Sequence, residues 1–173
     1  MTTRPKTKTK TKTKKKPLAI AVLRQSGIDA DIVATPFFCG KRKRKGVHLT
    51  ATFRALPPGK HGFHIHKAGD LRGEGCKGLC EHYDKGHHRH GAGPTSKKER
   101  HTGDLGNIQW SSTRRTLKKR YCLPNVSVQE LWGRSMIVHA DEDDLGKGHH
   151  EDSAITGHSG ARIGCAIFGR AYE

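Results

Sequence analysis

Histidine is concentrated in one part of the chain, and imidazole is a good ligand for transition metals. Eight of the 13 histidines fall between residues 61 and 101. Within this segment His64 and His66 stand two residues apart, alternating with Phe63 and Ile65. In a strand the two rings would project from one face while the apolar side chains enter the core. Such a pair can bind one metal, although a His-x-His pair alone is a weak signal.

A second group of potential ligands follows in a Gly-rich and His-rich stretch without sustained periodicity, residues 67–104. It consists of His82, His90, His101 and Asp104. Three imidazoles and a carboxylate suit tetrahedral Zn²⁺, and the metal would order a loop whose composition cannot order itself. The alternative is a His-rich surface loop with opportunistic metal affinity. A lone histidine, His139, ends a further apolar segment and needs support from elsewhere to count as a ligand.

The elements that would carry these side chains are short strands. Residues 47–54 alternate between apolar and polar side chains over a length typical of a half-buried strand. With turn signals between them, about eight such strands predict an antiparallel sandwich or barrel. The two long irregular stretches, 67–104 and 140–161, are unusual in a compact domain and therefore point to function. The expected strands are 18–23, 28–33, 47–54, 62–66, 106–110, 126–128, 134–139 and 162–168.

Composition limits the class of protein. The 173 residues suffice for one domain, and the 21 glycines favour turns and short strands over helices. No apolar run approaches the roughly 20 residues that would span a bilayer, so we expect no membrane span. The net charge of +17 predicts anionic partners: nucleic acid, acidic membrane or a small anionic substrate.

Residues 2–16 form a Lys/Thr-rich, low-complexity segment with almost nothing to bury, so we expect a disordered basic tail over residues 1–17. Two interpretations stay open: a solvated tail, or a tether for nucleic acid or another polyanion through phosphate neutralisation. No secretory pattern is apparent, which predicts a cytoplasmic or nuclear location, where disulfides are uncommon. The five cysteines lack zinc-finger spacing, and their odd number leaves at least one thiol without an intrachain partner.

Five blocks in sequence order carry a resemblance to a known family: GFHIH (62–66), GDLGNI (103–108), GRSMIVH (133–139), DDLGKG (143–148) and GARIGCAIFG (160–169). Together they resemble the Cu/Zn superoxide dismutase family over essentially all of residues 18–173. The resemblance implies an all-β fold, an eight-stranded antiparallel Greek-key β-barrel of the immunoglobulin-like sandwich type. The two irregular stretches would be its zinc loop and its electrostatic loop.

The resemblance also implies an activity and a set of site residues. Superoxide would be converted to dioxygen and hydrogen peroxide by copper redox cycling at an imidazolate-bridged copper–zinc site. Arg162 would hold superoxide beside the copper, and Asp143 would orient His64 and His90. A disulfide would join Cys76 to Cys165. The implied copper ligands are His64, His66, His82 and His139; the zinc ligands are His82, His90, His101 and Asp104, with His82 as the bridge.

Several positions depart from the family pattern. The stretch from His90 to His101 is about two residues longer than in familiar members, which leaves His87 and His88 as alternative ligands by register. Cys80 stands where no cysteine is expected. Residues 111–125 align poorly and predict a shortened strand there, and the partners of Cys39 and Cys122 stay unassigned. Ile155 occupies a position where a substrate-guiding lysine is common.

The family implies further partners. Many members are homodimers, and the patch of Leu131, Trp132 and Gly133 with Phe168, Gly169 and Gly69 corresponds to their dimer surface. A copper chaperone is another implied partner. Two rival functions stay open: a copper-delivery protein on the same barrel, and a nucleic-acid-binding basic protein with vestigial metal sites. The unusual tail would suit a virus-encoded protein.

Overall fold

The structure is a computed structural model, and it describes residues 19–25, 27–96 and 99–171. The expected disordered tail, residues 1–17, lies outside the described residues, as does Leu18. In the described part, no helix is long and apolar enough to cross a membrane.

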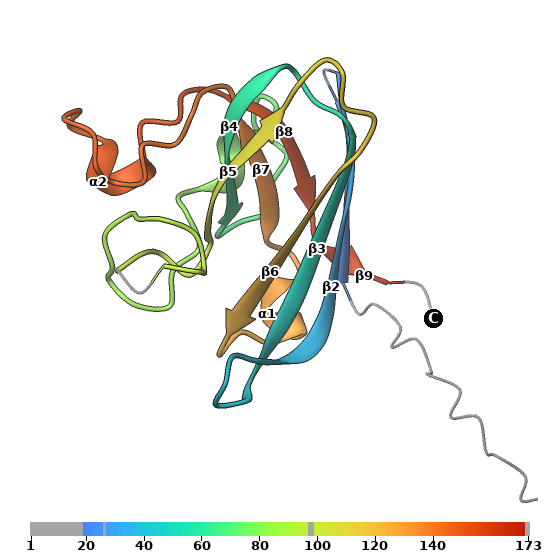
Figure 1. Cartoon of the computed structure of the whole chain (residues 1–173), viewed down its shortest axis with the longest axis vertical. Coiled ribbons are helices and arrows are strands. Elements are labelled where there is room, and N and C mark those ends of the chain that lie inside the picture. The colour runs from blue at the N-terminus through green and yellow to red at the C-terminus, as the bar shows by residue number, and fades with distance from the viewer. Residues whose placement is uncertain (1–18, 26, 97–98, 172–173) are drawn as a thin grey trace, which may run out of the picture.

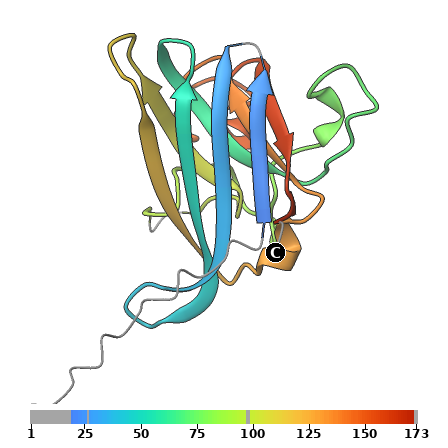
Figure 2. The same cartoon turned by 90° about the vertical axis from the view of Figure 1, so that its right-hand side faces the viewer.

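Two antiparallel sheets account for nearly all of the regular structure, which confirms the all-β prediction (Figures 1 and 2). The first sheet has the strand order β6-β3-β2-β1-β9, and the second has the order β5-β4-β7-β8. The strands of the first sheet are β1 (Ala19–Gln25), β2 (Ile28–Cys39), β3 (Arg44–Ala55), β6 (Leu117–Pro124) and β9 (Gly169–Arg170). Those of the second are β4 (Gly59–His66), β5 (Asp104–Trp110), β7 (Ser135–His139) and β8 (Arg162–Ile167).

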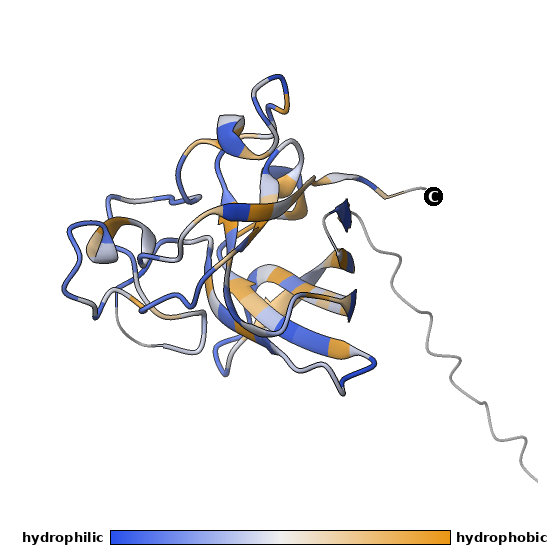
Figure 3. Cartoon of the chain, turned by 90° about the horizontal axis from the view of Figure 1, so that it is seen from above, coloured by the Kyte–Doolittle hydropathy of each residue, from blue (hydrophilic) through white to orange (hydrophobic). Residues whose placement is uncertain are grey.

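The core lies between the sheets and follows the predicted alternation. Val47, Leu49 and Phe53 on β3 are fully buried, and Phe63 on β4 packs edge-to-face against Phe53 with ring centroids 5.4 Å apart. Figure 3 shows hydrophobic and hydrophilic residues alternating along the strands. A one-residue slip of any strand would move its apolar side chains out of this core, so burial fixes the register that also places the functional side chains.

The two long loops leave the second sheet and lie on the same side of it (Figure 1). The first loop, which contains the 3-10 helix η1 (Lys77–Leu79), is tied to β8 by a disulfide between Cys76 and Cys165 with Cα atoms 5.8 Å apart. Leu79 is fully buried against Ile137 and Cys165. The second loop contains the helix α2 (Ser153–Thr156). The disulfide and the buried leucine therefore anchor the first loop where it passes the sheet.

Residues 126–128, expected as a strand, instead lead into the helix α1 (Val128–Leu131), so that prediction was wrong. Ser127 and Glu130 form a capping box: the Glu130 amide donates to Ser127 Oγ and the Ser127 amide to Glu130 Oε2. This Ser-x-x-Glu spacing is visible in the sequence and could have revealed the helix.

Within residues 111–125, where a shortened strand was expected, β6 pairs with β3 over eight consecutive positions. A second disulfide joins Cys39 at the end of β2 to Cys122 on β6. The intervening strand β3 presents Gly46 there, and a Cβ at Gly46 would lie 3.0 Å from Cys39 Sγ. Glycine thus leaves room for a bridge across a middle strand, a relationship that sequence spacing does not reveal.

Candidate metal centre

The adjacent strands β4 and β7 bring His64, His66 and His139 together. Phe63 pairs with Val138 across these strands, so the histidines follow at neighbouring positions on one face. The ring centroids of His64 and His139 are 4.8 Å apart, and those of His66 and His139 are 5.7 Å apart. The first loop adds His82 through a bridge to His66, and its ring centroid lies 4.2 Å from that of His64.

Four ring nitrogens of this cluster are buried and have no hydrogen-bond partner. Burying a polar atom without a partner is costly, and such atoms in a native fold require an explanation. The four atoms belong to residues whose potential ligand atoms lie within 4.8 Å of one another, as a single metal ion requires. Neutral imidazoles fit copper in both of its common oxidation states. The atoms are His64 Nδ1, His66 Nε2, His82 Nε2 and His139 Nε2.

The opposite nitrogens of three of these rings are held by oxygen acceptors. His64 Nε2 lies 2.8 Å from Asp143 Oδ2, and His66 Nδ1 lies 3.0 Å from the carbonyl oxygen of Cys80. His139 Nδ1 lies 3.2 Å from the carbonyl oxygen of Gly160. Donation to these oxygens places the proton on the outer nitrogen, which leaves the lone pair of the inner nitrogen free for a metal.

The second cluster converges on one carboxylate oxygen. Asp104 Oδ1 lies 2.8 Å from His82 Nδ1, 3.1 Å from His90 Nδ1 and 3.3 Å from His101 Nδ1. His90 Nδ1 nevertheless has no hydrogen-bond partner. The other oxygen, Asp104 Oδ2, accepts from the backbone amides of Gly91 and His101. Three nitrogens and one oxygen facing one point form the donor set of a tetrahedral zinc site.

The longer stretch between His90 and His101 does not change which histidine joins this cluster. His90 is buried beside Asp104, whereas exposed His88 turns its Nδ1 towards Asp84 at 3.0 Å. His87 is also exposed. The structure therefore brings together His90 rather than either alternative.

Two residues connect the clusters. His82 directs Nε2 to the first and Nδ1 to the second. Asp143 Oδ2 lies 2.8 Å from His64 Nε2, and its Oδ1 lies 2.8 Å from His90 Nε2. His82 is thus the ring shared by both clusters, and Asp143 is the carboxylate in contact with one ring of each.

Sequence reasoning missed the residues that hold Asp143 itself. Asn107 Oδ1 accepts from the Asp143 amide at 2.8 Å, and Asn107 Nδ2 donates to the Asp143 carbonyl at 2.7 Å. Gly157, in the left-handed region with φ of 74°, passes so close that a Cβ would collide with Asp143 Oδ1 and His90 Nε2. Asn107 lies within the GDLGNI block, so its position was visible although its role was not.

His61 is a second supporting residue that the sequence did not single out. Its buried ring lies with Nδ1 2.9 Å from the carbonyl oxygen of His139 and Nε2 2.9 Å from that of Pro57. It stands on the same strand face as Phe63. The ring therefore fixes the backbone at the end of β7, next to the imidazole of His139.

The histidines of the first cluster and His90 of the second have pKa values shifted in opposite directions. Burial lowers the pKa of His64 and His66 well below the ordinary value, lowers that of His82, and lowers that of His139 to about 4. Burial also acts on His90, but its contacts with Asp104 and Asp143 outweigh it and raise the pKa to about 9 in the absence of metal. The rings of the first cluster are thus neutral at pH 7, as metal ligation requires.

A pocket of about 500 Å³ leads to the first cluster, and His66, His139 and Arg162 contribute to its wall. The guanidinium of Arg162 is fixed by the first loop: Nη1 donates to the carbonyl oxygens of Cys76 and Lys77 at 2.9 and 3.0 Å, and Nη2 donates to that of Cys80 at 2.6 Å. A cation held rigidly beside an open metal position can orient a small anion.

The fold and the two clusters define a class: a β-sandwich protein whose shared imidazole links a four-histidine site to a zinc-type site. Comparison with known proteins agrees. The family described as copper/zinc superoxide dismutase (SODC) matches residues 37–168. This chain belongs to the copper/zinc superoxide dismutase family.

Individual relatives cover most of the chain. Superoxide dismutase [Cu-Zn] 3 of Arabidopsis thaliana is 44% identical over 124 residues, 70% of this chain and 74% of that protein. A putative superoxide dismutase [Cu-Zn] of Orgyia pseudotsugata multicapsid polyhedrosis virus is 42% identical over 71% of this chain and 81% of that protein. The superoxide dismutase [Cu-Zn] of Paramecium bursaria Chlorella virus 1 is 42% identical over 73% of this chain and 68% of that protein. Among solved structures, the clock protein EA4 superposes with a TM-score of 0.77 and 32% identity, covering 94% of this chain and all of that one.

Proposed function

We propose that this protein is a superoxide dismutase that converts superoxide to dioxygen and hydrogen peroxide with bound copper and zinc. The observation that carries the proposal is the set of four buried, unpartnered ring nitrogens beside a second cluster with the donor set of zinc. Copper would be held by His64, His66, His82 and His139. Zinc would be held by His82, His90, His101 and Asp104.

Bound copper supplies reversible one-electron exchange, which zinc lacks, so zinc has a structural and electrostatic part. The protein's own groups supply the remaining requirements. Asp143 and the carbonyl oxygens of Cys80 and Gly160 hold the imidazoles in one tautomer. His82, with one nitrogen in each cluster, couples the two sites and can accept a proton at Nε2 when that atom is not engaged by metal.

Arg162 is the proposed anion-orienting residue. Its three hydrogen bonds to backbone carbonyls fix the guanidinium without neutralising its charge. The pocket rim adds Lys77 as a second cation, while Glu81 and Asp152 add opposing charges. Attraction of superoxide into the pocket would therefore depend on Arg162 and on the net charge of +17.

The proposal extends to further partners. A homodimer would use the surface around Trp132, where the Arg170 guanidinium lies 4.7 Å from the indole centroid. Polyanion binding by the basic tail, copper delivery by a chaperone and a cytoplasmic location stay predictions from the sequence. The two viral relatives support a viral origin for the chain.

The rival copper-delivery function would not require Arg162 to face the cluster.

The deciding experiment is the superoxide disproportionation rate of the copper- and zinc-reconstituted protein, with metal content measured in the same samples. We expect a fast rate that disappears in His64→Ala, with His149→Ala as the control because His149 is exposed and outside both clusters. A wild-type rate no faster than that of His64→Ala, with both metals bound in the wild type, would leave a metal-binding protein without dismutase activity.

A further inference from the structure

A second surface, on the five-stranded sheet, combines exposed aromatic rings with basic side chains. Phe37 and Phe38 near the end of β2 are 48% and 55% exposed. Next to them the segment 41–45, which covers the β2–β3 turn and the first two residues of β3, reads KRKRK. The edge strand β6 adds Lys118 and Arg120, both exposed. We call this set the basic-aromatic surface: Phe37, Phe38, residues 41–45, Lys118 and Arg120.

The positive charge of this surface is not balanced locally. No acidic residue occurs between Asp31 and Asp70, or between Asp104 and Glu130. Within the described residues, none of the basic side chains of this surface forms an ion pair. The acids that β2 does carry, Asp29 and Asp31, lie at its other end and are paired with Arg24 and Arg54. A polyanion would therefore meet unpaired cations here.

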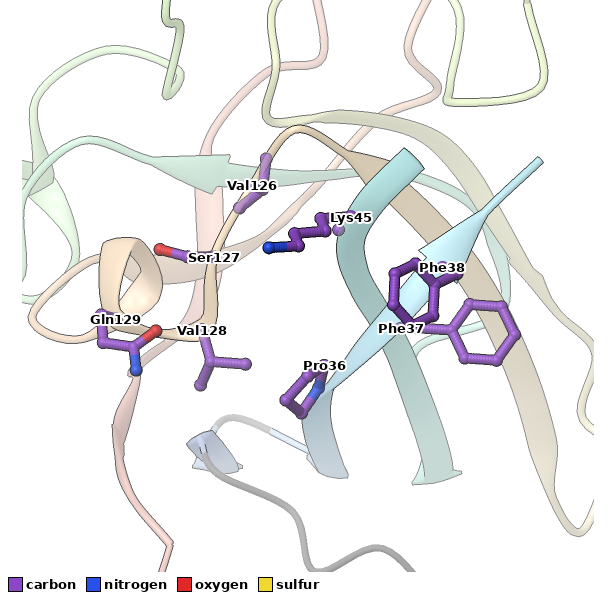
Figure 4. Close-up of a pocket in the computed structure, with 9 residues that line it drawn as sticks. Pro36, Phe37, Phe38, Lys45, Val126, Ser127, Val128 and Gln129 are labelled. Atoms are coloured by element: carbon purple, nitrogen blue, oxygen red, sulfur yellow. The ribbon is translucent and has the colours of Figure 1, made fainter. Parts of the chain in front are cut away.

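Exposed aromatic side chains are the second feature of this surface. Positive charge alone would be enough to keep molecules apart in solution, so the aromatic rings point to a binding role. The Phe37 ring lies 5.1 Å from the ring of His48. Phe38 lines a groove of about 330 Å³ together with Pro36, Val128 and Lys45. Figure 4 shows Lys45 extending across this groove towards Val126 and Ser127. An apolar floor beside a free ammonium group is suited to a flat aromatic group that carries a phosphate.

The strand register places Lys118, Arg120 and Phe37 along one face of the sheet, whereas Phe38 and Lys45 alternate to the other face and line the groove at the end of the strands. Across β3 and β6, Thr52 pairs with Lys118 and Thr50 with Arg120, and Gly46 pairs with Phe37 on one side and Pro124 on the other. At about 3.4 Å per residue, the line from Lys118 to the β2–β3 turn is roughly 25 Å long. Both metal clusters draw their strand ligands from the other sheet, so an occupant of this surface need not enter the active-site pocket.

We propose that the basic-aromatic surface binds single-stranded nucleic acid, with phosphates along Lys118, Arg120 and the β2–β3 turn and bases stacked on Phe37 and Phe38. Cationic strips that follow the backbone, combined with aromatic platforms for the bases, are the recurring solution for binding single strands without sequence preference. Duplex DNA offers the phosphates, but its bases are already stacked on one another and have no free face for Phe37 or Phe38. The surface therefore favours single strands over duplexes.

The test is a fluorescence-anisotropy titration of a labelled 12-nucleotide oligo(dT) with the full chain at several salt concentrations. The aromatic variant is Phe37→Ala/Phe38→Ala, with Leu71→Ala as its control because Leu71 is 49% exposed on the first loop. The charge variant is Lys118→Gln/Arg120→Gln, with Arg89→Gln/Lys147→Gln as a control that removes the same charge from exposed positions elsewhere. Because every protein keeps residues 1–17, any contribution of the tail is common to all of them.

We expect the aromatic variant to lose at least about fivefold in affinity for oligo(dT) and to lose the preference over a duplex of equal phosphate number. The charge variant should lower the slope of log K against log salt by about 1.4, the value for two phosphate contacts on a single strand. Superoxide turnover should stay unchanged in the aromatic variant and in Leu71→Ala, and it should be the same in the two charge variants, which lose equal charge; these results verify folding.

Three results would overturn the proposal. Equal oligo(dT) affinity of the aromatic variant and wild type would show that bases do not stack on Phe37 and Phe38. Equal losses of oligo(dT) affinity in the charge variant and its control would show that binding depends on overall positive charge and not on this surface. Binding of anionic phospholipid vesicles, or self-association, that depends on Phe37 and Phe38 while oligo(dT) binding does not would assign the surface to a membrane or to a second copy of the chain.

Discussion

Asp143 touches one histidine of each metal cluster: its carboxylate oxygens lie 2.8 Å from His64 Nε2 and 2.8 Å from His90 Nε2. Both rings therefore direct Nδ1 towards their metal clusters. Asp143 is only 1% exposed, so the contacts are buried. One side chain thus fixes the orientation of ligands that come from a strand and from a loop. The two sites are linked through this carboxylate as well as through His82.

Replacing Asp143 by Asn should weaken both metal sites while leaving the fold intact. An amide offers only one acceptor oxygen, and its NH₂ group would oppose the N–H of the second imidazole. We expect a loss of about 10- to 100-fold in metal affinity, measured by competition with a chelator for each metal. Glu142→Gln, which removes an exposed neighbouring carboxylate, is the control. Wild-type affinity in Asp143→Asn would remove this residue from the support of the clusters.

Reversing the charge of Arg162 should affect turnover rather than metal binding. Arg162→Glu replaces the cation of the pocket by an anion that repels superoxide, and we expect activity to fall by about tenfold or more. Copper and zinc content, measured by elemental analysis, should match wild type. Arg115→Glu makes the same charge change on an exposed turn and serves as the control. Equal activity in the two variants would assign the effect to net charge alone.

The metal-free protein should be less stable on both sides of neutral pH. His139, with a pKa of about 4 when folded and about 6.5 when unfolded, binds its proton preferentially in the unfolded state at intermediate pH. Stability therefore falls as pH drops from about 6.5 towards 4, and His64 and His66 act in the same direction. His90, with a pKa of about 9, stabilises the fold below pH 6.5, and this contribution disappears as pH rises through 9.

Urea unfolding of the metal-free protein at pH 5.5, 7.5 and 9.5 measures these effects. We expect the highest midpoint at pH 7.5. His139→Gln should reduce the loss at pH 5.5, whereas His149→Gln, at an exposed position, should not. A midpoint that is constant over this range would contradict the burial of neutral imidazoles in the metal-free fold.

The two disulfides should differ in their effect on activity. Each closes a large loop, with sequence separations of 83 and 89 residues, so the chain-entropy model assigns each a similar stabilisation of about 4.5 kcal/mol. Cys76–Cys165 anchors the loop that fixes Arg162, whereas Cys39–Cys122 lies within the other sheet. Cys39→Ser/Cys122→Ser should lower the thermal midpoint but leave turnover unchanged at 25 °C. Cys76→Ser/Cys165→Ser should lower both, and equal loss of activity in the two variants would contradict this division.

One thiol should be accessible in the oxidised protein. Cys80 is exposed, and the other four cysteines are paired. Treatment of the native, unreduced protein with a maleimide should add one label, which peptide mass spectrometry should place on Cys80. Cys80→Ser should abolish the labelling. Labels on other cysteines, or none on Cys80, would indicate a different pairing.

The sequence alone determined the all-β class and gathered the ligand candidates, because strand alternation and the spacing of histidines are local properties. The two-residue spacing of His64 and His66 placed both rings on one face before any other contact was considered. The ordered motif blocks added His139, Asp143 and Arg162, which spacing alone does not identify as functional residues.

Only the tertiary structure decided how these residues meet. The choice of His90 over His87 and His88 depends on the path of a loop whose sequence has no periodicity. The Cys39–Cys122 bridge depends on Gly46 in the strand between the two cysteines, and the position of Asp143 depends on Asn107 and the close approach of Gly157. These are contacts between segments far apart in the chain, where distance is set by packing of the whole fold and not by local pattern.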